Sequence, residues 1–437
     1  MTKGTARPGW LILLVLVATV GAAWGPTPVR GAERPVTLTF WPSSNPEEIA
    51  FARAVIADWH ALRPDVRIEM QPLPASRSTE EVLLAAIAGR TTPDIVANIY
   101  PGAVAQYVES GALIPLDRFP DFEQVMAERL PPGVLESFRS PDGHVYQVPW
   151  KTNPIMLGYN VGMLREAGVA PEQLATYEGF LEAGSRLVAD LNGDGQPDRW
   201  TILLNIEPTW WQRLFDFYTL YVAASGGRTL LDDGRVAFAN DSAVQVMAFL
   251  AELFARGLAP RSTFPGDPFL GGRVATVLTG PWSIPYWEAN KPAGMSYGFR
   301  SVPVPSLEPG QPVWTYGDPK NIGIFTSTRH PELAWEFVKF YISRENDLRL
   351  VRITSQIPFR RDLLEDPEWP AVASQWPQLR PFLEQMRYTV GVDSSPHLVA
   401  ILDAISSEYQ YAAVLGMASP EEAIRNAAEA AEELLSW

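Results

Sequence analysis

The sequence predicts an α/β protein of two lobes, each built on a sheet with a parallel core. Its 437 residues exceed what one hydrophobic core normally holds, so we expect two lobes. An apolar content of 46% with 19% charged residues is typical of a globular chain and excludes extended disorder. Strand-like and helix-like patterns alternate in the first hundred residues after the N-terminal segment. That alternation predicts parallel strands covered by helices.

The alternation starts at residues 36–41, where apolar and polar residues take turns as in a strand. Asn45 then begins a helix with Pro46 at its first position. A second strand is expected at residues 66–70. Ser78 begins the next helix, which ends at Gly89, and a third strand follows at 94–99. Glu48 and Glu81 stand three residues after their caps, which predicts two capping boxes.

The carboxyl ends of parallel strands meet at one edge of a sheet, where open α/β folds bind their ligands. Trp41 ends the first strand, and Ser43 and Ser44 follow it. Tyr100 follows the third strand. We therefore expect these four residues to line a ligand crevice.

Later segments continue the α/β pattern. Residues 155–160 predict a strand, and Thr176 caps a helix whose apolar stripe includes Phe180. Near the C-terminus, Ser419 precedes Pro420 and begins a last helix.

The N-terminal segment predicts a secretory signal peptide over residues 1–31, with cleavage between residues 23 and 32. Lys3 and Arg7 precede an uncharged run of 15 residues from 10 to 24, shorter than the ~20 residues that a spanning helix needs. An uncleaved membrane anchor is the alternative.

The charge balance argues against polyanionic partners. The chain has a formal net charge of −15, and loss of residues 1–31 would remove Lys3, Arg7 and Arg30 and no acid, which changes it to −18. A nucleic acid would be repelled, so we expect no nucleic-acid partner. The chain has no cysteine, so core packing alone stabilises it.

One segment, residues 269–282, carries more information than any other. Its apolar run from Val274 to Leu278 lies between glycines and a Gly-Pro pair, which predicts a buried strand ending near Trp282. The indole suits the flat apolar face of a sugar ring. The segment resembles the F-x-x-G-[KR]-x-A-M-x-x-x-G-x-W signature of the family 1 extracellular solute-binding proteins of ABC importers, the carbohydrate-binding group that includes maltose-binding protein.

Other segments resemble the same family in order along the chain. Residues 142–149 resemble D-G-K-x-Y-G-x-P, residues 176–183 resemble T-W-D-E-F-L-x-A, and residues 356–361 resemble x-x-P-x-R. The resemblance implies a periplasmic-binding-protein-like fold in which three chain crossings form a hinge between the lobes. It implies a first lobe of residues 33–147 plus 305–343 and a second lobe of 148–304 plus 344–437.

Aromatic and polar residues near the expected crevice and crossings are the candidate ligand contacts. Each tryptophan can also be a packing residue, each serine a helix cap, and Lys151 a solvated surface charge. Trp210 and Trp211 would not both face inward from an extended chain. The full set of candidates is Trp41, Ser43, Ser44, Tyr100, Trp150, Lys151, Asn153, Trp210, Trp211, Trp282, Trp314, Tyr316, Asp318, Asn321 and Arg361.

A polar loop at residues 190–198 matches the spacing of a calcium-binding loop. Residue 201, at the last ligand position, is Thr, so the usual bidentate glutamate is missing. A metal-free turn fits the pattern equally well. The candidate ligands of a structural calcium are Asp190, Asn192, Asp194, Gln196 and Asp198.

These observations predict the substrate-binding component of an ABC importer. It would capture an oligosaccharide or related polyol by hinge closure and deliver it to membrane permease subunits. The chain lacks the motifs of serine hydrolases, zinc proteases and nucleotide-binding loops, so we expect no enzyme and no required cofactor. The family resemblance, with no cysteine for lipidation, implies a freely diffusing periplasmic monomer. A polyamine, a phosphorylated polyol, or a secreted carbohydrate-active enzyme are the alternatives.

Overall fold

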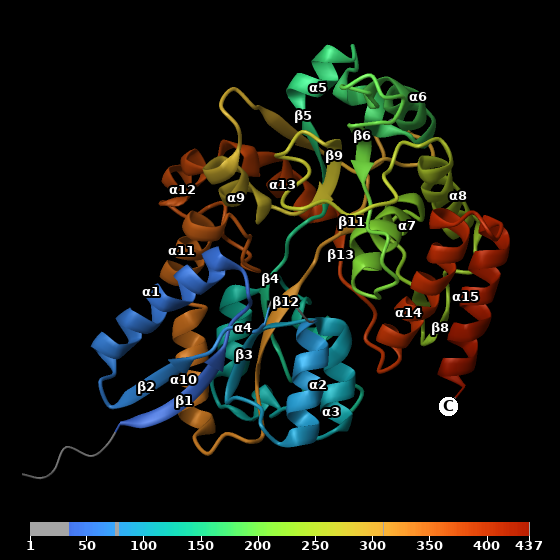
Figure 1. Ribbon diagram of the computed structural model, residues 1–437. Helices are drawn as coiled ribbons and strands as arrows, with labels where there is room; N and C mark the ends of the chain where they lie inside the picture. The colour runs from blue at the N-terminus through green and yellow to red at the C-terminus, as the bar shows by residue number, and fades with distance from the viewer. Residues whose placement is uncertain (1–34, 75–77, 309, 437) are drawn as a thin grey trace, which may run out of the picture.

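The computed structural model describes residues 35–74, 78–308 and 310–436 of the chain. They form two α/β lobes joined by chain segments that pass between them (Figure 1). The expected signal peptide lies outside the described residues. Within the described part, no helix combines the length and apolarity needed to cross a membrane.

The first lobe is built on a five-stranded sheet with the order β2-β1-β3-β12-β4. Strand β1 pairs in parallel with β2 and β3, whereas β12 is antiparallel to both β3 and β4. The predicted parallel core is therefore the first three strands. The strand bounds are β1 (Val36–Trp41), β2 (Val66–Met70), β3 (Ile95–Ile99), β4 (Val148–Lys151) and β12 (Lys320–Ile324).

Helices cover this sheet and bury its apolar side chains. Phe40 of β1 contacts the rings of Phe337 and Tyr341 at centroid distances of 5.5 and 5.2 Å. Their burial stabilises the lobe without any disulfide. The helices of this lobe are α1 (Pro46–Leu62), α2 (Thr79–Gly89), α3 (Val104–Glu109), α4 (Phe122–Arg129) and α10 (Pro331–Tyr341).

The second lobe is built on a four-stranded sheet with the order β10-β5-β9-β6. Only β6 and β9 pair in parallel, while β5 is antiparallel to β9 and β10. Strand β9 is the strand predicted inside residues 269–282. The bounds are β5 (Met156–Asn160), β6 (Trp200–Leu203), β9 (Val274–Thr279) and β10 (Tyr297–Arg300).

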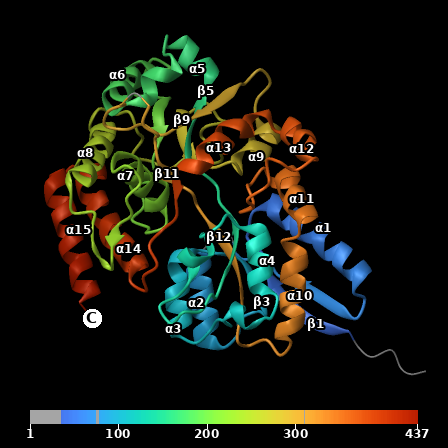
Figure 2. The same ribbon diagram turned by 180° about the vertical axis from the view of Figure 1, so that it is seen from behind.

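The ten other helices of the described chain are mostly grouped around the second sheet, and α11 also packs on α1 of the first lobe (Figure 2). Helix α15 packs on both α14 and α8 at one side of the molecule. The bounds are α5 (Val161–Glu166), α6 (Tyr177–Leu187), α7 (Thr219–Ala224), α8 (Asp241–Ala255), α9 (Ser283–Asn290), α11 (Arg344–Thr354), α12 (Trp369–Gln375), α13 (Arg380–Gln385), α14 (Leu398–Tyr409) and α15 (Pro420–Leu435).

Helix starts are where the capping residues predict them. The side chains of Asn45, Ser78, Thr176 and Ser419 each accept a hydrogen bond from the backbone amide three residues later. Glu48 differs from the expected capping box, because its carboxylate pairs with Lys151 instead.

The segments that pass between the sheets are tied together. From the first crossing, Thr152 and Asn153 bond to the carbonyl oxygen of Gly317, which follows the short strand β11 (Thr315–Tyr316). Strand β11 pairs with β13 (Thr389–Val390), and a separate hairpin joins β7 (Leu231–Asp232) to β8 (Arg235–Val236). The residue boundaries of the lobes stay a proposal.

A buried arginine clamps two of these segments. The Arg129 guanidinium donates to the carbonyl oxygens of Trp150 and Ile342 at 2.9 Å and pairs with Asp347. Arg360 binds the same Asp347 oxygen at 2.6 Å. One carboxylate and two guanidiniums thus hold the end of β4 against the start of α11.

The lobes also touch away from the crossings. Leu398 of α14 packs on Gly102 of the first lobe so closely that a Cβ on Gly102 would lie 2.6 Å from the Leu398 Cδ2 atom. Tyr100 and Trp210, from opposite lobes, have ring centroids 5.5 Å apart. The two lobes therefore form one packed body on this side.

Candidate functional site

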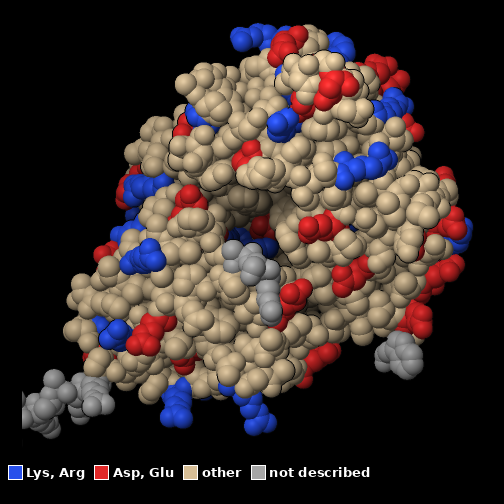
Figure 3. Space-filling view, viewed as in Figure 1, with Lys and Arg blue, Asp and Glu red and all other residues tan. Residues whose placement is uncertain are grey.

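A cavity of ≈ 560 Å³ lies between the lobes. The space-filling view shows the molecule hollowed there, with acidic and basic side chains in the hollow (Figure 3). Its size is within the range of small-molecule sites. The residues that line this cavity, called the main cavity below, are Ser43, Ser44, Asn45, Glu48, Ser78, Thr79, Glu80, Glu81, Asn98, Tyr100, Lys151, Glu207, Thr209, Trp210, Trp211, Leu214, Phe215, Trp282, Asp318, Lys320 and Gln356.

Aromatic rings from both lobes face the main cavity. Tyr100, directly after β3, supplies the first-lobe ring, and Trp210, Phe215 and Trp282 supply second-lobe rings. Phe215 meets Trp282 edge to face at a centroid distance of 6.1 Å. Such flat apolar faces pack well against the C–H faces of a sugar ring.

Both tryptophans of the 210–211 pair line the main cavity. The expectation that only one faces inward assumed an extended backbone, whereas the chain turns at this point. Trp210 is buried against Tyr100, and Trp211 is 37% exposed at the opening.

The position of Trp282 depends on Gly280. A Cβ on Gly280 would lie 2.0 Å from the Cζ3 atom of the Trp282 ring, so the indole folds back over the end of β9 where only glycine fits. The Ser355 hydroxyl donates to the carbonyl oxygen of Pro281 at 2.5 Å. The Gly-Pro-Trp turn is thus held from two sides.

A buried ion pair forms the floor of the main cavity. Lys151 and Glu48, 1% and 4% exposed, are joined by a Nζ–Oε1 contact of 2.5 Å. Gln356 donates to the same Glu48 oxygen at 2.7 Å and accepts from the Asn153 side-chain amide at 3.0 Å. Burial alone would raise the pKa of Glu48, but Lys151 and the hydrogen bonds from Gln356 and Ser43 hold it below its usual value.

A second ion pair lies on the wall formed by the segment before β12. The Lys320 Nζ atom is 2.6 Å from the Asp318 Oδ1 atom, which also accepts a hydrogen bond from the Tyr316 hydroxyl at 3.2 Å. Asp318 has φ 33° and Asn98, within β3, has φ 104°. Non-glycine residues rarely adopt these angles, and strained residues concentrate at binding sites.

Carboxylates outnumber cations in the main cavity. Lys151 and Lys320 are both paired, which leaves Glu80, Glu81 and Glu207 without an ion pair among the described residues. Glu80 is only 7% exposed, and burial raises its pKa. Glu81 and Glu207 are exposed at the rim.

The structure thus brings eight of the predicted residues to one cavity, and these are Ser43, Ser44, Tyr100, Lys151, Trp210, Trp211, Trp282 and Asp318. Lys151 is not the solvated surface charge of the alternative interpretation, because it is buried and paired.

Trp41 does not line the main cavity. Strand β1 continues through Trp41, which pairs with Val96 of β3, and its side chain packs against apolar residues. Trp150 does not line the main cavity either, because its ring lies in the first-lobe core. The ring centroids of Trp150 and Phe51 are 6.4 Å apart. The first-lobe aromatic face is therefore Tyr100.

Three predicted polar residues support the site from behind it. The Asn153 side-chain amide donates to the Gln356 side-chain oxygen, and the Tyr316 hydroxyl donates to the Asp318 carboxylate. The Asn321 amide donates to the Gln147 side-chain oxygen at 2.6 Å. None of the three lines the main cavity.

The last two candidates are remote from the main cavity. Trp314 packs on Gly227 and meets Tyr388 at 5.9 Å, and Arg361 is an exposed side chain whose backbone amide bonds to Arg129.

Several lining residues were missed by sequence reasoning. The spacing of Glu48 and Glu81 predicts capping groups, and no motif marks Glu80, Asn98, Glu207, Lys320 or Gln356 as lining residues. The signal available for Glu80 and Glu81 was their place at the start of a helix next to the sheet edge that binds ligands.

The polar loop at residues 190–198 is closed by its own hydrogen bonds. The Asp190 carboxylate accepts from the amides of Gly193 and Gly195 at 2.7 and 2.8 Å, and Asp194 accepts from that of Gln196 at 2.8 Å. Across the described ranges, no three or more His, Cys, Asp or Glu side chains are grouped to hold a metal. These hydrogen bonds close the turn, and a calcium site here stays a prediction.

Comparison with known proteins places the chain in a family. Residues 54–379 match the family described as bacterial extracellular solute-binding protein. The maltotriose-binding protein of Pyrococcus abyssi is 22% identical over 338 residues, 76% of this chain and 68% of that one. The arabinooligosaccharide-binding protein of Bacillus subtilis is 22% identical over 82% of this chain and 81% of its own length.

A crystal structure of an uncharacterized protein from Listeria monocytogenes superposes with a TM-score of 0.74. It is 29% identical, and the match covers 92% of this chain and 100% of that one. The family match spans most of the two-lobed fold and all lining residues of the main cavity except Ser43, Ser44, Asn45 and Glu48. The chain belongs to the bacterial extracellular solute-binding proteins.

Proposed function

We propose that this protein is the substrate-binding component of an ABC importer and captures an oligosaccharide or related polyol. One observation carries the proposal: the main cavity lies between two lobes and combines aromatic faces with hydroxyl, amide and carboxylate groups. Similarity to a maltotriose-binding and an arabinooligosaccharide-binding protein supports the same ligand class.

The lining chemistry suits a sugar. Tyr100 and Trp282 offer apolar faces from opposite lobes, and Ser43, Ser44 and Asn98 offer hydrogen-bonding groups. Sugar hydroxyls must find such partners once they leave water, because an unsatisfied buried polar group costs about 1–3 kcal/mol.

Capture works by closure of the lobes around the hinge. A ligand that touches both lobes only when they shut must bind the closed state more tightly by ~5.5 kcal/mol to shift a mostly open population to a mostly closed one. A micromolar dissociation constant corresponds to about 8.2 kcal/mol, so a few stacked rings and hydrogen bonds suffice.

The partners and location follow from this role. We infer that residues 1–31 direct export, that the mature protein diffuses freely outside the cytoplasm as a monomer, and that the closed form docks on a membrane permease. It would bind and release its ligand unchanged, without catalysis.

A thermal-shift screen against sugars, polyamines and phosphorylated polyols tests the proposal. A ligand at 100 times its dissociation constant adds ~2.7 kcal/mol to the free energy of unfolding. We expect at least one carbohydrate to raise the melting temperature. The sugar assignment would be abandoned if none did, and reducing ends released from a glycan would indicate an enzyme.

A Trp282→Ala variant tests the site separately. We expect it to lose most of the affinity for the carbohydrate found in the screen. Full affinity in this variant would show that the indole only packs.

A cation-bearing cargo such as a polyamine is the second candidate, favoured by the buried Glu80 carboxyl and the two acidic residues at the rim. The same acids disfavour a phosphorylated polyol, because they would repel its phosphate. Spermidine and a maltooligosaccharide, tested on wild type and Glu80→Gln, distinguish the two cargo classes.

A further inference from the structure

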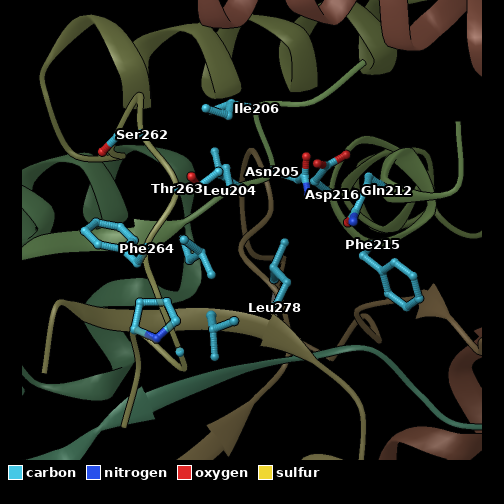
Figure 4. A pocket seen from close by; sticks show the side chains of 14 residues that line it. Leu204, Asn205, Ile206, Gln212, Phe215, Asp216, Ser262, Thr263, Phe264 and Leu278 are labelled. Atoms are coloured by element: carbon cyan, nitrogen blue, oxygen red, sulfur yellow. The ribbon is translucent and has the colours of Figure 1, made fainter. Parts of the chain in front are cut away.

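The second lobe contains another cavity, of ≈ 300 Å³, called the side cavity below. Figure 4 shows Ser262, Thr263 and Phe264 on one side of it, Asn205, Gln212 and Asp216 on the other, and Leu278 of β9 below. Its volume is at the lower end of the range for small-molecule sites. Its residues come from the lobe that carries Trp282.

The side cavity adjoins the main cavity through Phe215. The Phe215 side chain lines both, and its ring meets Trp282 of the main cavity at a centroid distance of 6.1 Å. Phe215 lies in a π-helical turn, residues 214–218, and such turns frequently mark functional sites. A ligand stacked on Trp282 therefore needs only to pass one aromatic ring to enter the side cavity.

The lining of the side cavity selects for a neutral, hydroxylated group. Gln212, Ser262 and Thr263 have side chains with no hydrogen-bond partner elsewhere in the described chain, while Val277 and Leu278 supply an apolar face. The one acid, Asp216, is 2.9 Å from Arg213 and accepts the amide of Phe217 at 2.6 Å. Because Asp216 is already paired with Arg213, the described lining of the side cavity has no unpaired charge that would bind an ionic ligand.

We propose that the side cavity binds an end ring of an oligosaccharide whose other rings occupy the main cavity. This inference rests on the proposed function and makes it more specific, because it requires a ligand long enough to span Phe215. Amide and hydroxyl groups would bind the sugar hydroxyls, and the β9 side chains would contact the apolar face of the ring.

A variant in which a larger side chain fills the side cavity tests this inference. Thr263 is exposed, so Thr263→Trp should fold, and its indole would occupy the space. Ser374→Trp, on an exposed position of α12 that lines neither cavity, is the matched control. Isothermal titration would measure the affinity of both variants and wild type for maltooligosaccharides and arabinooligosaccharides of increasing length, with the melting temperature as a check on folding.

We expect wild-type affinity to rise by about tenfold between a short and a longer sugar of one series, the equivalent of one or two net hydrogen bonds. Thr263→Trp should remove that rise and leave the short sugar unaffected, and Ser374→Trp should change neither. The inference would be overturned if wild-type affinity did not rise with sugar length or if Thr263→Trp kept that rise. It would also be overturned if Thr263→Trp weakened the affinity for sugars of all lengths equally. If wild type bound no sugar, the proposed function itself would fail.

Discussion

The Trp282 ring lies directly over Gly280, with 2.0 Å between its Cζ3 atom and the place of a Cβ at that glycine. The glycine and the tryptophan of the 269–282 segment therefore act as one unit. The small residue leaves the space into which the indole folds, and the indole forms part of the main cavity wall.

Gly280→Ala should weaken ligand binding by about tenfold or more, because the added methyl displaces an aromatic ring worth on the order of 1 kcal/mol or more in contact energy. Titration with the sugar found by thermal shift measures this. Gly89→Ala, on an exposed helix position where a Cβ meets nothing closer than 3.5 Å, is the control and should bind normally. Equal affinity in both variants would contradict the prediction.

Lys151→Met should reduce the free energy of unfolding by about 3–5 kcal/mol, because it leaves the buried Glu48 carboxylate without its cation. Urea denaturation measures the loss, and the double variant Glu48→Gln/Lys151→Met should recover much of it. Arg256→Met, which breaks the exposed pair with Glu252, should cost no more than about 0.5 kcal/mol. A similar loss in both single variants would show that the buried pair of Lys151 and Glu48 stabilises the fold no more than an exposed pair does.

The buried pair of Lys151 and Glu48 should also make the free energy of unfolding sensitive to acid. Because the folded-state pKa of Glu48 is lowered, its contribution is present above its unfolded pKa of about 4.5 and is lost as the pH falls through the folded value. Urea midpoints between pH 7 and pH 3 should therefore fall more steeply for wild type than for Glu48→Gln/Lys151→Met. Parallel curves for the two proteins would rule this out.

Glu80→Gln should stabilise the protein at neutral pH, by on the order of 1 kcal/mol, since a buried unpaired carboxylate is removed. The raised folded-state pKa means that wild-type stability falls as the pH rises from the unfolded pKa to the folded one. The difference between variant and wild type should therefore grow over that interval. A variant less stable than wild type at pH 7 would contradict this.

Arg129→Met should destabilise the protein by about 3 kcal/mol or more, since it removes a guanidinium that joins α4, the end of β4 and the start of α11. Asp347 would keep only Arg360. Arg53→Met, an exposed position of α1 that makes no ion pair within the described residues, is the control. Chemical denaturation compares the two, and an equal effect would show that the clamp is dispensable.

Local patterns in the sequence predicted much of the fold because the causes of helix starts and strands are local. The side chains of Asn45, Thr176 and Ser419 cap helices as expected, and β9 lies in the predicted run. The direction of β12 was not readable from its own residues, since it depends on which strands it joins.

The site was predicted only in part because its polar contacts join distant segments. Glu48 has the spacing of a capping residue, and only the fold brings it beside Lys151 and Gln356, about one hundred and three hundred residues away. Trp41 and Tyr100 both stand where a strand of the sheet stops, but pairing with Val96 keeps Trp41 inside β1, whereas Tyr100 follows the last residue of β3.

The contact between Leu398 and Gly102 joins the lobes beside Tyr100, whose ring also lies against Gly102 and lines the main cavity. Whenever the lobes part, this apolar contact must break, and its surface must meet water. The contact therefore favours the closed arrangement of the lobes. A permease that pulls α14 away from the first lobe would remove that preference without touching the sugar.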